Sequence, residues 1–89
     1  MDVTFEQETP NGVYVAKFSI SSDSNIHIEE DVPASKLRIY QSGVEDGTYV
    51  AVTTLQPYGT AFDFDLTGLV YPKYIKLESL TPVKSCVVS

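Results

Sequence analysis

Apolar and polar residues alternate along most of this chain, and turn-forming residues interrupt the alternation at short, regular intervals. Successive side chains of an extended strand point to opposite faces, so a period of two predicts strands buried on one side. No credible helix pattern is present. The alternating segments are Val3 to Glu8, Val13 to Ile20, Asn25 to Glu30, Lys36 to Tyr40, Thr48 to Leu55, Ala61 to Leu66 and Tyr74 to Leu80, with Val83 to Val88 as the candidate for a last strand.

The clearest alternation is in the sixth of these segments. Phe62 and Phe64 are expected to face the interior there, and Asp63 and Asp65 to face solvent. The same pattern places Leu37 and Ile39 inside in the fourth segment. The expected core of this half of the chain is therefore Leu37, Ile39, Phe62 and Phe64.

Turn signals separate the segments. Asn11 and Gly12 lie between the first two, and an Asn-Gly pair is a strong hairpin signal because both central residues of a type I′ turn need a positive φ angle. Pro57, Tyr58 and Gly59 predict another turn further along the chain.

Seven to eight short strands with turns between them predict an all-β fold, an antiparallel β-sandwich of the jelly-roll or immunoglobulin-like type. The 89 residues are expected to form a single domain over residues 1–89. A domain of this size buries only about 60 to 65% of the surface that its unfolded chain exposes. The core is therefore expected to be thin.

Residues 36–80 contain four short motifs in this order: Lys-Leu-Arg-Ile-Tyr-Gln-Ser, Asp-Gly-Thr-Tyr, Phe-Asp-Phe-Asp-Leu and Tyr-Pro-Lys-Tyr-Ile-Lys-Leu. This order resembles the second half of discoidin-type, galactose-binding-like jelly rolls. In that family a strand is followed by a loop with an Asp-Gly pair and then by later strands, the last of a Lys-Tyr-Ile-Lys-Leu type. The resemblance implies a sandwich architecture and suggests a carbohydrate-binding or adhesion module. No ligand-binding residue is carried over from it.

The formal net charge of −6 lies in residues 1–35, while residues 36–89 are neutral overall. Six basic residues neutralise few phosphates, so a nucleic-acid partner is not expected. An anionic membrane surface would repel the domain. A cationic or neutral partner fits better, either a protein scaffold or an oligomer, and a glycan remains an alternative.

No secretory signal pattern or apolar run of transmembrane length is present, so the chain is expected to be made in the cytoplasm. It would be extracellular if it is a module excised from a longer protein. With Cys86 as its one cysteine, the chain forms no internal disulfide. Its stability is expected to come from packing or from assembly with other chains.

No catalytic constellation is recognisable in the sequence. His27 lies between Ile26 and Ile28, so alternation places it on the solvent face of a strand, and Cys86 is interpreted as a small, half-buried apolar residue. One histidine and one cysteine cannot supply a tetrahedral metal site. The chain is therefore not expected to be an enzyme or to bind a cofactor.

Calcium is the one metal for which oxygen ligands are available. Asp63 and Asp65 project from one face of a strand, and Glu45 and Asp46 in a nearby loop are further weak candidates. No calcium-binding loop is recognisable, however. Carboxylates that face outward from a strand more often serve solubility and edge protection.

Six tyrosines provide the remaining candidate surface. A tyrosine ring gives a large contact area at low entropic cost and keeps a polar tip, which suits interfaces. Loops gather at the ends of a sandwich, so a loop end is the expected partner-binding surface. The residues expected there are Tyr58, Tyr71, Tyr49, Glu45 and Asp46. Replacing Tyr58 and Tyr71 with alanine is expected to leave the fold intact and to weaken partner binding.

These features favour a non-enzymatic structural or interaction protein that docks on a larger protein assembly. The class resembles the capsid decoration proteins and tail or fibre modules of phage virions, which would make the chain virion-associated. The alternative is a carbohydrate-binding or adhesion module from a longer extracellular protein.

Overall fold

The computed structural model describes residues 1–7, 12–29, 37–52, 56–58, 61–80 and 82–89, without the side chains of residues 56–58, 61 and 62. The described residues form nine strands: β1 (Glu6–Gln7), β2 (Tyr14–Ile20), β3 (Ser24–Glu29), β4 (Leu37–Ser42), β5 (Val50–Val52), β6 (Gln56–Tyr58), β7 (Ala61–Leu66), β8 (Lys73–Ser79) and β9 (Ser85–Val88). Within these ranges no helix is long and apolar enough to cross a membrane.

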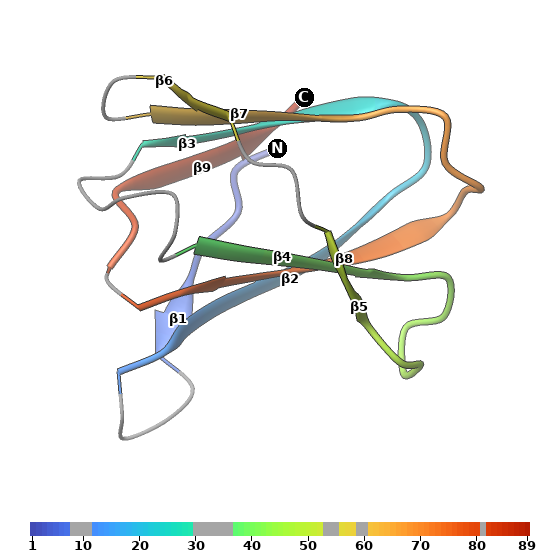
Figure 1. The fold of residues 1–89 in the computed structure, drawn as a ribbon, viewed down its shortest axis with the longest axis horizontal. Helices are drawn as coiled ribbons and strands as arrows, with labels where there is room; N and C mark the ends of the chain where they lie inside the picture. Colours follow the sequence, from blue (N-terminus) through green and yellow to red (C-terminus); the bar gives the residue numbers. More distant parts are fainter. Residues whose placement is uncertain (8–11, 30–36, 53–55, 59–60, 81) are drawn as a thin grey trace.

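The strands form two antiparallel sheets that lie face to face (Figure 1). One sheet has the order β1-β2-β8-β4-β5, and the other has the order β6-β7-β3-β9. We call them the five-stranded and the four-stranded sheet. The predicted all-β antiparallel sandwich is confirmed.

Both sheets are built around one pair of antiparallel chain segments. β2 pairs with β8 in the five-stranded sheet, and β3 pairs with β7 in the four-stranded sheet. The segments β2–β3 and β7–β8 therefore run side by side and cross from one sheet to the other together, a nested pairing typical of jelly rolls. β4 then adds to β8, and β6 adds to β7.

The predicted hairpin at the start of the chain is present. β1 pairs with β2, with Glu6 opposite Val15 and Gln7 opposite Tyr14. Gly12 has a φ of 82°, a backbone conformation that residues with a Cβ rarely adopt. The turn residues 8–11 lie outside the described part of the chain.

The core consists of aliphatic side chains from the inner faces of both sheets. The four-stranded sheet contributes Ile26 and Ile28, and the five-stranded sheet contributes Leu37, Ile39, Ile75 and Leu77, all almost fully buried. Phe64 packs against this cluster, as the alternation predicts, whereas the predicted core position of Phe62 lies outside the described side chains. Burial of each aliphatic side chain contributes roughly 1.5 to 3 kcal/mol, so the thin core depends on every member.

One detail of the predicted elements is wrong. Pro57 and Tyr58 were assigned to a turn, but they belong to β6, an edge strand in which a proline is tolerated because one side of the strand needs no backbone donor. Val50 is 63% exposed, whereas Val52, on the same face of β5, is partly buried.

The first residues of the chain extend the four-stranded sheet beside β9. Asp2 bridges Val87 in antiparallel fashion, and the Val3 amide donates a hydrogen bond to the Cys86 carbonyl at 2.9 Å. The Met1 amino group lies 2.7 Å from the Val88 carbonyl oxygen. The two chain ends therefore lie close together (Figure 1).

Candidate interaction site at the loop end of the sandwich

Three connections meet at one end of the sandwich, at the right of Figure 1. They are residues 21–23 between β2 and β3, residues 43–49 between β4 and β5, and residues 67–72 between β7 and β8. We call this the loop end. It is the candidate functional site because most of the residues singled out in the sequence lie there.

The loop of residues 43–49 is held in place by its own hydrogen bonds. The Ser42 hydroxyl donates to the Val44 carbonyl at 2.7 Å and accepts from the Val44 amide at 3.1 Å. A Cβ on Gly47 would lie 2.9 Å from the Ser42 hydroxyl oxygen, so this close approach requires glycine. The Tyr49 hydroxyl donates to the Glu45 carbonyl at 2.9 Å and ties the end of the loop to its middle.

Asp23 joins the other two connections. Its carboxylate accepts hydrogen bonds from the Gly68 amide at 3.2 Å and from the Tyr71 hydroxyl. The bond to Asp23 raises the pKa of the Tyr71 phenol, because it stabilises the protonated form. The Tyr71 ring also packs against the core. Replacing Tyr71 with alanine is therefore expected to loosen the fold, which corrects the expectation from the sequence that the fold would stay intact.

A groove of about 280 Å³ opens at the loop end, between β2, β8 and the loop of residues 43–49. Its lining combines aromatic rings with charges of both signs. The lining residues are Lys17, Phe18, Ser19, Glu45, Asp46, Tyr49 and Tyr74.

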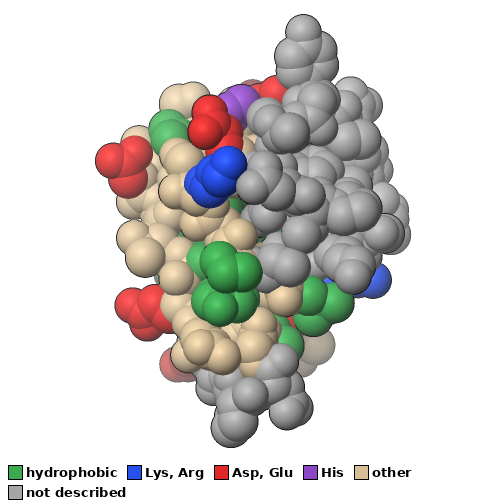
Figure 2. Space-filling model, turned by 90° about the vertical axis from the view of Figure 1, so that its left-hand side faces the viewer, with side chains coloured by type: hydrophobic (Ala, Val, Ile, Leu, Met, Phe, Trp, Pro, Cys, Tyr) green, Lys and Arg blue, Asp and Glu red, His purple; other side chains and the backbone are tan. Residues whose placement is uncertain are grey.

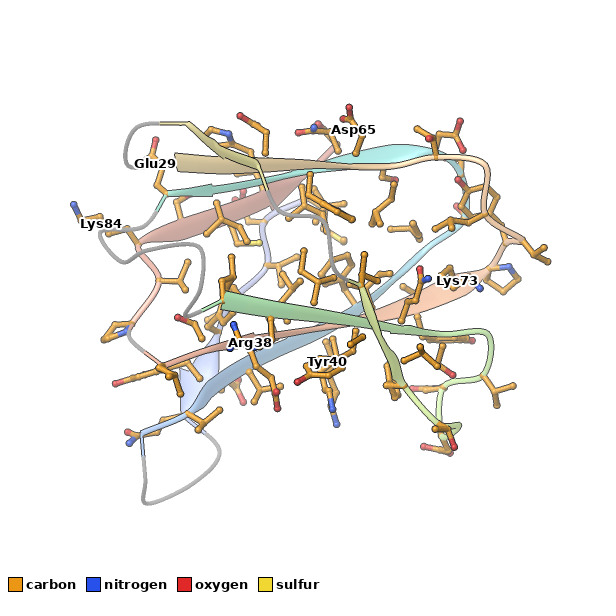
Figure 3. The ribbon with its side chains drawn as sticks, viewed as in Figure 1. Glu29, Arg38, Tyr40, Asp65, Lys73 and Lys84 are labelled. Atoms are coloured by element: carbon orange, nitrogen blue, oxygen red, sulfur yellow. The ribbon has the colours of Figure 1, made fainter. Side chains whose placement is uncertain are left out.

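Beside the groove, the outer face of the five-stranded sheet carries a row of cations and rings. Lys17 lies directly opposite Lys76, and Lys76 lies opposite Tyr40. The Lys76 ammonium is 4.6 Å from the centroid of the Tyr40 ring and 5.4 Å from that of Tyr49, so it makes cation–π contacts with both. Figure 3 shows Tyr40 projecting outward from β4.

The phenols of this face are harder to ionise than free tyrosine. Burial raises the pKa of Tyr40, and a hydrogen bond with Glu78 raises it further. Burial also raises the pKa of Tyr49, and the negative charges of Glu45 and Asp46 add to the effect. Both rings therefore stay neutral at physiological pH and present an uncharged aromatic surface.

Large aliphatic side chains are exposed around the same end. Val44 is 64% exposed, Val50 is 63% exposed and Val70 is 82% exposed. Val44 precedes Glu45 and Asp46 in the loop of residues 43–49, and Val50 follows that loop. Val70 lies in the connection of residues 67–72. Exposed apolar residues at the same end as a polar groove are compatible with a contact surface.

The opposite end of the sandwich faces the viewer in Figure 2. A smaller hollow of about 210 Å³ lies on the five-stranded sheet toward that end. Val13, Arg38, Glu78, Ser79 and Leu80 line it. Leu80 is exposed there, which makes it a useful control position.

The structure brings some of the residues predicted for partner binding together and separates others. Glu45, Asp46 and Tyr49 line one groove, and Tyr71 lies at the same end in the next connection. Tyr58 does not belong with them. It pairs with Ala61 at the start of β7, so its backbone lies at the opposite end of the sandwich.

Sequence reasoning missed the contribution of β2 and β8. Lys17, Tyr74 and Lys76 come from strands that are more than fifty residues apart, and only the pairing of β2 with β8 places them together. Alternation correctly places Lys17 on an outer face. It contains no information about which strand lies alongside.

The calcium candidates do not converge. Asp63 and Asp65 lie on the outer face of the four-stranded sheet, where Asp65 accepts a hydrogen bond from Asn25 at 2.7 Å. Glu45 and Asp46 lie beside the five-stranded sheet instead. Among the described residues no group of three or more acidic, histidine or cysteine side chains could hold a metal ion.

His27 and Cys86 lie on opposite faces of the four-stranded sheet. The His27 ring nitrogen Nδ1 is 2.8 Å from Asp63 Oδ1 on the outer face. Cys86 is fully buried on the inner face, more deeply than the expected half-buried position. Burial raises the pKa of its thiol to about 11, so the thiol stays protonated at neutral pH.

No protein-family model matches the chain, and neither the curated proteins nor the solved structures include a significant match. The resemblances to discoidin-type jelly rolls and to virion modules therefore remain predictions from the sequence.

Proposed function

We propose that the chain is a non-enzymatic interaction protein that docks on a larger protein assembly through its loop end. The observation that carries this proposal is the exposure of Val44, Val50 and Val70 beside a groove that contains both rings and charges. Such a surface, apolar in part and with oriented polar groups, suits a protein partner better than a small apolar ligand.

The placement of the reactive side chains supports a role without catalysis. His27 is the only histidine and Cys86 the only cysteine of the chain, and the sheet itself separates them. The thiol is protonated and buried, so it is a poor nucleophile.

A virion-associated role, as a capsid decoration protein or a tail or fibre module, is the most specific form of this proposal. A small acidic sandwich with one cysteine, and therefore without an internal disulfide, is compatible with it. Glycan binding has less support. Sugars stack on open aromatic faces, whereas Lys76 covers one face of both Tyr40 and Tyr49.

Cosedimentation tests the docking proposal. Purified protein is mixed with particles from its source and separated on a density gradient, and comigration with particles of virion size is expected. The double variant Val44→Asp, Val70→Asp places charges on exposed positions that the fold does not need. We expect it to remain folded and to lose comigration.

The matched control is Leu80→Asp, which makes the same kind of change at the opposite end. It is expected to comigrate like the unmodified protein. Docking through this end would be contradicted if the unmodified protein sediments separately from the particles. It would also be contradicted if the loop-end variant comigrates with the particles as well as the unmodified protein does.

A further inference from the structure

The groove at the loop end holds charged side chains that form no ion pair within the described part of the chain. Lys17, Glu45 and Asp46 all line the groove, all are exposed, and none forms an ion pair there. Charges arranged around a hollow without internal partners are available to a ligand of complementary charge.

One ring of the groove lies close to its carboxylates. Tyr49 and Tyr74 both line the hollow, and the charges of Glu45 and Asp46 contribute to the raised pKa of the Tyr49 phenol. A flat ring next to a carboxylate binds a cation in two ways, by a cation–π contact and by an ion pair.

The protein itself shows that these rings accept cations. The Lys76 ammonium lies over both the Tyr40 ring and the Tyr49 ring on the adjoining sheet face. Tyr49 also lines the groove, together with Tyr74. The net charge of −6 further favours the approach of a cationic segment.

Resting on the docking role proposed above, we propose that the groove receives an arginine side chain of the protein partner. The guanidinium group lies against Tyr49 and Tyr74 and pairs with the carboxylates of Glu45 and Asp46. Arginine fits better than lysine because its planar group stacks on a ring and donates two parallel hydrogen bonds to a carboxylate. Lys17, on the β2 side, is placed to bind a carboxylate or carbonyl next to that arginine.

A titration with N-acetyl-arginine amide tests this assignment, followed by ¹H–¹⁵N correlation spectra at constant ionic strength. We expect saturable shifts confined to the groove, with a dissociation constant on the order of 1 to 10 mM, as a single side chain provides. N-acetyl-citrulline amide has nearly the same shape without the charge and is expected to bind about tenfold more weakly.

Paired variants separate the groove from general electrostatics. Glu45→Gln with Asp46→Asn is expected to weaken arginine binding about fivefold or more, because both ion pairs are lost. Glu6→Gln with Glu29→Gln removes the same charge from exposed strand positions and is expected to change binding less than about twofold.

Equal binding of the citrulline and arginine amides, shifts outside the groove, or equal weakening by both variant pairs would overturn the proposal. Equal binding of N-acetyl-lysine amide would overturn the assignment to arginine. If arginine fails to bind while comigration with particles still depends on Val44 and Val70, only this inference fails and the docking role stands.

Discussion

On the outer face of each sheet, polar residues of neighbouring strands lie directly opposite one another, but the two sheets differ in the charges that are paired. On the four-stranded sheet, His27 lies opposite Asp63 and Asn25 lies opposite Asp65, and both pairs make close polar contacts. On the five-stranded sheet, Lys17 lies opposite Lys76, and two like charges meet. Figure 3 shows Asp65 and Tyr40 projecting from these two faces in opposite directions.

This difference indicates where a cross-strand pair lacks a complementary charge. Directly opposite residues of complementary charge stabilise a sheet, whereas like charges destabilise it. On the four-stranded face, both of these pairs are complementary. The five-stranded face places Arg38 opposite Glu78 but also retains the Lys17–Lys76 repulsion, which the rings around Lys76 moderate. Such an uncompensated arrangement is expected where a partner completes the surface.

Removal of a core side chain beneath either face should have the largest effect. Ile26→Ala lies behind the four-stranded face and Leu77→Ala behind the five-stranded face, and both residues are fully buried. Each substitution should lower the free energy of unfolding by about 3 kcal/mol, because it leaves a cavity. Urea denaturation measures this. A loss below about 1 kcal/mol for one variant would mean that the two faces do not share a core.

Alkaline pH should have the next largest effect, by lowering the free energy of unfolding through Cys86 in the four-stranded sheet. The Cys86 thiol has a pKa of about 11 in the folded protein against 9.0 when unperturbed, so its contribution is complete below pH 9 and is lost as the pH rises through 11. The loss should approach about 2 to 3 kcal/mol. Unfolding curves between pH 7 and 11 measure it, with Cys86→Ala as the comparison.

The Cys86→Ala variant should be less stable at pH 7 but should lose less on going to pH 11. A smaller decline remains in the variant, because the pKa values of Tyr40, Tyr49 and Tyr71 are also raised on folding. Identical pH profiles for the two proteins would show that the thiol does not titrate with unfolding.

The two cross-strand pairs themselves should give the smallest effects, with opposite signs. A double-mutant cycle through His27→Ala and Asp63→Ala should yield a favourable coupling of about 0.5 kcal/mol, since both side chains are partly exposed. The equivalent cycle through Lys17 and Lys76 should yield an unfavourable coupling of a few tenths of a kcal/mol, roughly the size expected for facing like charges. Couplings of the same sign would remove the distinction between the faces.

Much of the fold follows from alternation alone. The inward positions of Ile26, Ile28, Leu37 and Ile39 are confirmed, because a strand buried on one side leaves a period of two in the sequence. β6 was missed because Pro57 and Gly59 are turn signals, and pairing along one edge overrides that local preference.

The candidate site was only half predictable for a related reason. Glu45, Asp46 and Tyr49 belong to one loop, so the sequence places them together. Tyr58 follows shortly along the chain, yet its pairing with Ala61 carries it to the other end. Nearness in sequence is therefore a guide within one loop but not across a strand.

The sequence by itself determined the strand class, the inner and outer faces, and the charge available to each segment, because these depend on neighbours one or two residues away. The tertiary structure decided which strands pair and in what register. Only the pairing of β2 with β8 sets Lys17 against Lys76 and completes the groove with Tyr74, since contacts between distant segments are fixed by the packing of the whole sandwich.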